Sequence, residues 1–67
     1  MNEQALIKIQ SIIMGLDREL KQYVDELLSG QGLLNEDQLS KMINSTTREL
    51  SVYNYILKLI IINGNNN

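Results

Sequence analysis

Residues Ser29 to Leu39, SGQGLLNEDQL, separate two long segments of apolar-periodic sequence and decide the fold. Gly30 and Gly32 lie near the start of this stretch, and glycine readily adopts the left-handed backbone with which many helices end. Asn35 is suited to cap a new helix, and Gln38, three residues later, can complete a capping box. The stretch therefore predicts the end of one helix, a short turn and the start of a second helix.

The segment before this stretch carries an unbroken heptad pattern. Its apolar residues alternate between spacings of three and four, as the a and d positions of a helix–helix seam do. Asn2 is suited to cap the first turn, and no proline interrupts the segment. We expect a helix over about residues 3–28. Its seam residues are Leu6, Ile9, Ile13, Leu16, Leu20, Tyr23 and Leu27.

The segment after the stretch repeats the heptad pattern over a similar length. We expect a second helix over about residues 36–62, ended by Gly64 as its left-handed residue. Leu34 and Leu39 hold the positions of a hydrophobic staple at its start. Thr46 is the one polar residue of the seam. The seam residues are Leu39, Ile43, Thr46, Leu50, Tyr53, Leu57 and Ile60.

Together these patterns predict an all-α fold, an antiparallel two-helix hairpin with its turn over residues 29–35. We expect one domain over residues 1–63 and a disordered polar tail over 64–67. A chain of 67 residues without cysteine has a small core and no disulfide to stabilise it. A single core of this size supplies only about 3–5 kcal/mol. We therefore expect oligomerisation or a partner to complete the fold.

Several apolar residues fall outside both seams, so contact between the two helices cannot cover them. An exposed apolar patch of this extent marks an interaction site in a soluble protein. The second helix becomes apolar on nearly all sides toward its end, where Tyr55 is the best anchor for a partner. The predicted partner interface consists of Val52, Tyr55, Ile56, Leu59 and Ile62 in the second helix, and Ile7, Ile12 and Met14 in the first.

Composition and charge argue against nucleic-acid and membrane partners. The net charge is −2, and the six basic residues are dispersed rather than gathered into a stripe. The longest apolar-rich run, residues 56–62, is far shorter than the roughly 20 residues of a membrane-spanning helix. The N-terminus lacks the pattern of a secretion signal. We expect no nucleic-acid binding, no membrane insertion and a cytoplasmic location.

No group of residues in the sequence suggests catalysis. The chain has no histidine to activate a serine or to bind a metal ion. Carboxylate pairs at Asp25–Glu26 and Glu36–Asp37 flank the turn, where we expect a convex acidic tip in contact with solvent. General acid–base chemistry needs a shaped and partly dry pocket instead. We therefore expect no enzymatic activity, no metal site and no cofactor.

Over residues 16–59 the chain resembles a known family, the small needle-subunit co-chaperones of bacterial type III secretion (YscE and EscE type). The resemblance lies in DRELKQYVDELL, the break SGQG, the helix start NEDQLSKM and the apolar run YNYILKL. It implies a hairpin without enzymatic activity that acts in the cytoplasm. It also implies a TPR-like chaperone as partner, with which the hairpin keeps the needle subunit unpolymerised. The surplus apolar faces would then be docking sites.

A second interpretation comes from a different class of protein. Two helices of matching length suit a homodimeric four-helix bundle. A small phage or plasmid regulator of this kind would inhibit a host protein or nucleic acid. The two interpretations differ in whether the surplus apolar faces bind a different protein or a second copy of the chain.

Overall fold

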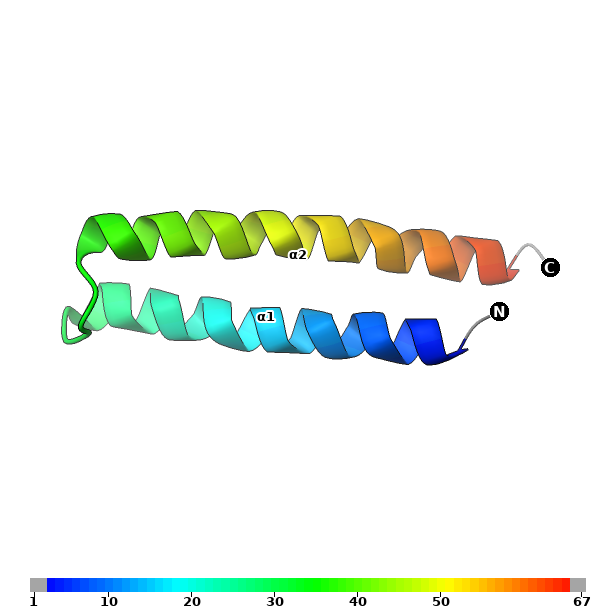
Figure 1. Ribbon diagram of the computed structural model, residues 1–67, viewed down its shortest axis with the longest axis horizontal. Helices are drawn as coiled ribbons and strands as arrows, with labels where there is room; N and C mark the ends of the chain where they lie inside the picture. The colour runs from blue at the N-terminus through cyan, green and yellow to red at the C-terminus, as the bar shows by residue number, and fades with distance from the viewer. Residues whose placement is uncertain (1–2, 66–67) are drawn as a thin grey trace.

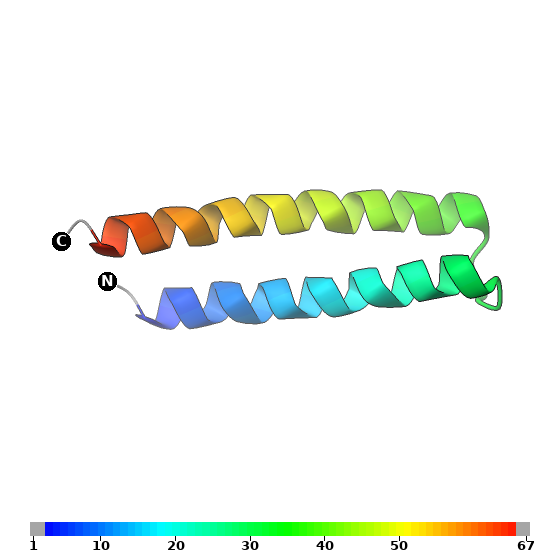
Figure 2. The same ribbon diagram turned by 180° about the vertical axis from the view of Figure 1, so that it is seen from behind.

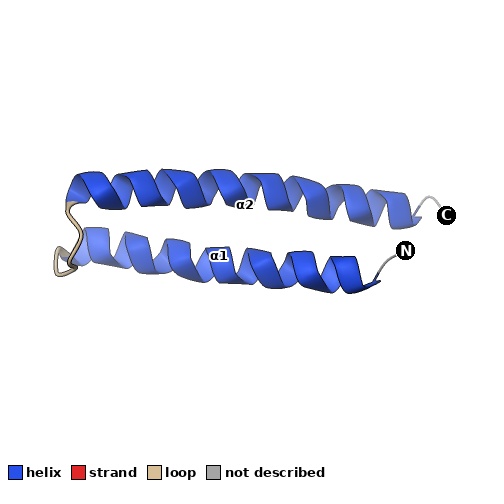
Figure 3. Ribbon diagram, in the orientation of Figure 1, coloured by secondary structure: helices blue, strands red, loops and turns tan. Residues whose placement is uncertain are grey.

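The computed structural model describes residues 3–65, which form an antiparallel hairpin of two helices (Figure 1). Helix α1 spans Glu3–Ser29 and helix α2 spans Glu36–Asn65. Figure 2 shows the same two helices side by side from behind. Within residues 3–65 there is no strand (Figure 3). The all-α hairpin predicted from the sequence is confirmed, and it measures 50 × 15 × 12 Å.

Helix α1 ends in the left-handed turn that its glycine predicts. Gly30 has a φ of 68°, and its N–H donates to the Glu26 carbonyl oxygen at 2.9 Å. This single bond satisfies a carbonyl group that the helix end would otherwise leave unpaired. The Ser29 hydroxyl donates to the same carbonyl at 3.3 Å and accepts from the Gln31 N–H at 3.3 Å. The chain therefore leaves α1 one residue later than predicted, with its direction fixed by Gly30.

Helix α2 begins with the capping box that the sequence predicts. The Gln38 N–H donates to Asn35 Oδ1 at 2.8 Å, and the Asn35 N–H donates to Gln38 Oε1 at 3.0 Å. The Leu39 N–H donates to the Asn35 carbonyl oxygen at 3.0 Å, which is the first helical bond. Leu34 is half-buried and Leu39 is buried, as expected for a hydrophobic staple. The prediction at Asn35 and Gln38 is confirmed.

The far end of α2 differs from the prediction. The helix continues three residues beyond residue 62 to Asn65, and Gly64 lies within it without a positive φ. The prediction that Gly64 ends the helix is therefore wrong. Each added residue gains a hydrogen bond once the preceding turns exist, which offsets the cost of about 1 kcal/mol for a helical glycine. Of the predicted tail 64–67, the last two residues lie outside the described part, as does the predicted cap Asn2.

The contact between the helices is thin. Leu39 and Leu50 are the buried apolar side chains of the described residues, with 2% and 8% of their surface exposed, and Thr46 is buried at 6%. Helix α1 has no buried residue. Each helix covers only one side of the other. The remaining seam residues are half-buried, and they are Leu6, Ile9, Ile13, Leu16, Leu20, Tyr23, Leu27, Ile43, Tyr53, Leu57 and Ile60.

Candidate interaction surface

The residues of the predicted partner interface are mostly exposed. On α2, Val52 exposes 54% of its surface and Tyr55 exposes 62%. Ile12 and Ile56 are half-buried beside the seam. The other exposed members of the set are Ile7, Met14, Leu59 and Ile62. Apolar side chains at this exposure are available to a partner without any rearrangement of the hairpin.

Three further apolar side chains are exposed that the predicted interface omits: Leu28, Leu33 and Ile61. Leu28 lies 21 residues after Ile7 and 14 after Met14, both multiples of seven, so the heptad spacing places it on the same stripe of the first helix. Leu33 lies in the turn, outside any helical periodicity, so no repeat in the sequence indicates its exposure. Ile61 adjoins Ile62 on the last turns of α2.

Heptad positions place these residues on opposite sides of the hairpin. With the seam residues numbered a and d, Ile7 and Met14 are b positions, Val52 and Leu59 are c positions, and Ile56 is a g position. In one helix, b lies on one side of the seam and c and g lie on the other. Because the two helices run in opposite directions, like heptad positions share a side of the hairpin.

The hairpin therefore has two distinct apolar surfaces. The g flank contains Val52, Ile56 and Leu59 of α2 together with Ile12 of α1. The b flank contains the α1 stripe Ile7, Met14 and Leu28. Tyr55 and Ile62 are f positions, on the outer edge of α2 beside the g flank. The predicted interface is thus not one continuous patch, since Ile7 and Met14 face away from the α2 stripe.

The two flanks differ in chemical character. On the g flank, a groove of about 370 Å³ is lined by three apolar or aromatic residues, Val52, Tyr53 and Ile56, and by Arg48 and Glu49. On the b flank, a groove of about 250 Å³ is lined by Met14 and three charged residues, Asp17, Arg18 and Lys21. Apolar helix side chains pack best where charged groups need not be desolvated. The g flank is therefore the better surface for a partner helix.

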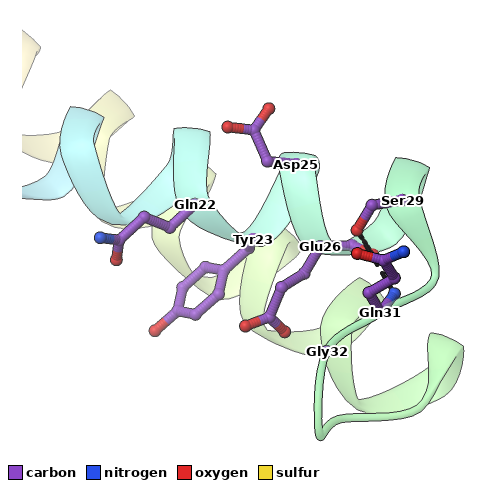
Figure 4. A pocket seen from close by; sticks show the side chains of 7 residues that line it. All are labelled: Gln22, Tyr23, Asp25, Glu26, Ser29, Gln31 and Gly32. Carbon is purple, nitrogen blue, oxygen red and sulfur yellow. Dashed lines mark hydrogen bonds between the residues drawn. The ribbon is translucent and has the colours of Figure 1, made fainter.

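A third groove lies beside the turn (Figure 4). It has a volume of about 540 Å³, and its wall includes Tyr23, Asp25, Glu26 and Gly32. Figure 4 shows the Glu26 side chain directed toward Gly32, while Asp25 points away. Among the described residues, Glu26 Oε2 is buried without a hydrogen-bond partner. The sequence predicts a convex acidic tip, and this side of the tip is instead hollowed, with Glu26 half-buried beneath the turn.

Gly32 allows this position of Glu26. A Cβ atom on Gly32 would overlap the Glu26 carboxylate. The other three carboxylates near the turn, Asp25, Glu36 and Asp37, are exposed. The residues lining the groove include no basic side chain. The arrangement accounts for a close contact between helix α1 and the turn, and it brings together no nucleophile and base.

The described residues 3–65 also bear on metals and membranes. They contain no group of three or more acidic, histidine or cysteine side chains that could hold a metal ion. Neither helix, over the residues described, is both long enough and apolar enough to cross a membrane. What the surface offers is apolar area. Burial of one large apolar side chain contributes about 1.5–3 kcal/mol to binding or folding.

Comparison of the chain with models of known protein families, with curated proteins and with solved structures found no match. The resemblance to the type III secretion co-chaperones therefore stays a prediction, drawn from length, turn position and apolar rhythm. The geometry of the g flank, with its groove and its neighbouring charges, is the direct observation from which a function can be argued.

Proposed function

We propose that the protein is a non-enzymatic protein-binding module, a helical hairpin completed by helices of another polypeptide chain. The observation that carries this proposal is the α2 stripe in which Val52 and Leu59 are exposed and Ile56 is half-buried, along a groove that Val52 and Ile56 help to line. Spacings of four and three along one helix are those by which a helix docks into a groove or seam. A second layer of helices would cover this stripe.

The thin core supports the same proposal. Only Leu39 and Leu50 among the described apolar side chains are buried, although each helix has a complete seam. Ordering each residue costs about 1–2 kcal/mol of backbone conformational entropy, and the half-buried seam residues bury only part of their apolar area to offset that cost. Burial of the g flank against a partner would add apolar contacts to both helices at once. Binding and folding are therefore coupled in this proposal.

For the identity of the partner, the resemblance over residues 16–59 supports a co-chaperone of type III secretion. In this proposal the hairpin acts in the cytoplasm beside a TPR-like chaperone, and together they hold a needle subunit unpolymerised. TPR repeats form an extended concave surface of helices. The apolar stripe of α2 has the shape and chemistry to lie in such a surface.

A second candidate is a small phage or plasmid regulator that forms a homodimeric four-helix bundle and inhibits a host protein. The lengths of the helices favour it, because α1 has 27 residues and α2 has 30. Helices of nearly equal length can pair along their whole extent in a two-layer bundle. The inhibitory surface would then lie on the outside of the bundle.

Thermal unfolding at several protein concentrations tests whether the chain needs a second layer. Circular dichroism at 222 nm should show a midpoint that rises with concentration if the chain self-associates, or a broad transition of low midpoint if its partner is absent. A sharp transition at high temperature that does not depend on concentration would contradict the proposal. It would show that the hairpin is stable without any cover on its apolar flanks.

Sedimentation analysis of the purified chain separates the two candidates. A tight homodimer that persists at high salt and melts in one step supports the regulator and contradicts an obligate co-chaperone. A chain that is soluble and folded only when it is co-expressed with a TPR-like protein supports the co-chaperone and contradicts the self-associating regulator.

A further inference from the structure

We infer that the g flank is covered by a second copy of this chain, with α2 packed antiparallel against α2 and Ile56 beside the two-fold axis. This inference rests on the proposed protein-binding function and names the occupant of its surface. It favours the homodimeric candidate over a TPR-like partner on the g flank. It goes further in fixing which helix makes the contact, in which direction, and around which residue. The b flank of α1 stays outside this contact.

The spacing of the α2 stripe is suited to a two-fold contact. Val52 precedes Ile56 by four residues, and Leu59 follows it by three. The stripe is therefore almost symmetric about Ile56, and an antiparallel copy brings Val52 close to Leu59 of the second copy. A two-fold interface requires the same patch on both chains to be self-complementary. This pairing meets that requirement with apolar side chains of similar size.

The exposed area matches what a dimer needs. A compact monomer of 7.7 kDa is expected to expose about 4,300 Å². This chain exposes 5366 Å², an excess of about 1,000 Å² over that expectation. A standard protein–protein interface buries about 800 Å² on each partner. One contact of standard size along the g flank would therefore remove most of the excess.

The part of α2 that makes most of this contact is nearly free of charged residues. From Leu50 to Asn65 the only charged residue is Lys58, a b position on the opposite flank, so the contact desolvates no charge there. The last turn of α2 has no basic residue. A helix C-terminus carries a partial negative charge. The antiparallel pairing places both Arg48 and Glu49 beside the last turn of the second copy. The positive charge of Arg48 there offsets the negative charge of Glu49.

The b flank is not covered in this dimer. Ile7, Met14 and Leu28 remain exposed on the far side of α1, where a different protein can bind without displacing the second copy. A partner that needs the g flank must instead compete with the second copy. In this dimer the g flank binds a second copy of the chain, and the b flank remains available to a different protein.

Site-specific crosslinking tests the inference directly, because the chain has no native cysteine. Ile56→Cys places one thiol beside the two-fold axis, next to the same thiol of the second copy. In a glutathione redox buffer most of this variant should become a disulfide-linked dimer on a non-reducing gel. A disulfide needs Cα atoms within about 7 Å of each other. Met14→Cys, an exposed thiol on the b flank, is the matched control and should stay monomeric on the gel.

A second crosslinking test uses two different cysteine variants, so that the inference can still be tested if Ile56→Cys does not fold. Val52→Cys and Leu59→Cys, tagged to differ in size, should form the mixed dimer in excess over either self-linked dimer. Circular dichroism of each variant shows whether it remains helical. Helical variants that crosslink no faster than Met14→Cys would overturn the inference. If the chain then still takes up a different protein on its apolar surface, the proposed binding function stands without this dimer.

Discussion

At the scale of single residues, the turn shows how local chemistry fixes the direction of the chain. Asn35 and Gln38 bond each other's backbone, and Gly30 supplies the left-handed residue that ends α1. Both features could be predicted from the sequence because they depend on residues three or four positions apart. The placement of Glu26 under Gly32 could not, since it depends on how the loop folds back onto α1.

The capping box should contribute measurably to stability. Replacing Asn35 with alanine removes the acceptor for the Gln38 N–H, and the expected loss is about 1 kcal/mol. For a chain of this size this lowers the melting temperature by about 4–8 °C at a fixed protein concentration. Asn44→Ala is the matched control, because this exposed position lies within α2, where alanine is the better helix former. Equal losses for the two variants would contradict the capping role of Asn35.

The two turn glycines should respond differently to alanine. Gly30→Ala forces a side chain into a left-handed backbone, which costs about 1–2 kcal/mol in any background. Gly32→Ala displaces Glu26, so its cost should vanish once Glu26→Ala has removed the carboxylate. A double-mutant cycle compares the wild-type chain, Gly32→Ala, Glu26→Ala and the variant with both changes. Urea denaturation of these four chains should give a coupling free energy of at least about 0.5 kcal/mol between Gly32 and Glu26. Equal costs of Gly32→Ala in both backgrounds would disprove the contact.

At the scale of the elements, the two helices follow from the heptad pattern but their burial does not. Every seam residue named from the sequence is buried or half-buried, because spacing alone decides which side of a helix faces its neighbour. The sequence could not show that α1 buries none of its residues, since that depends on how many neighbours the helix has. The end of α2 also differed, because helix continuation to Asn65 overrides the weak propensities of Asn63 and Gly64.

Two leucines near the turn should differ sharply in their contribution to the stability of the hairpin. Leu39 is 2% exposed at the start of α2, and Leu28 is 79% exposed at the end of α1. Leu39→Ala removes buried contacts and should lower the free energy of unfolding by about 2–5 kcal/mol. Leu28→Ala should change it by less than about 0.5 kcal/mol, because it lies on the open b flank. Chemical denaturation at equal protein concentration measures both, and similar losses would contradict the burial pattern.

At the scale of the whole molecule, we propose that the hairpin is one layer of a two-layer structure. Apolar residues outside the seams could be recognised in the sequence. Their division between two flanks follows only once the antiparallel seam is established, because the direction of α2 decides which positions share a side. This division separates the α1 stripe of Ile7 and Met14 from the α2 stripe of Val52 and Leu59. Substitutions in the α1 stripe can therefore serve as the control for substitutions in the α2 stripe.

Sedimentation equilibrium of three matched chains tests the central claim most directly. The wild-type chain should have the mass of a dimer, and Val52→Asp with Leu59→Asp should reduce it to the mass of a monomer by placing charges in the g flank. Ile7→Asp with Met14→Asp makes the same kind of change on the b flank and should leave the dimer intact. A wild-type chain that sediments as a monomer at all concentrations, or equal effects of the two double variants, would contradict the account.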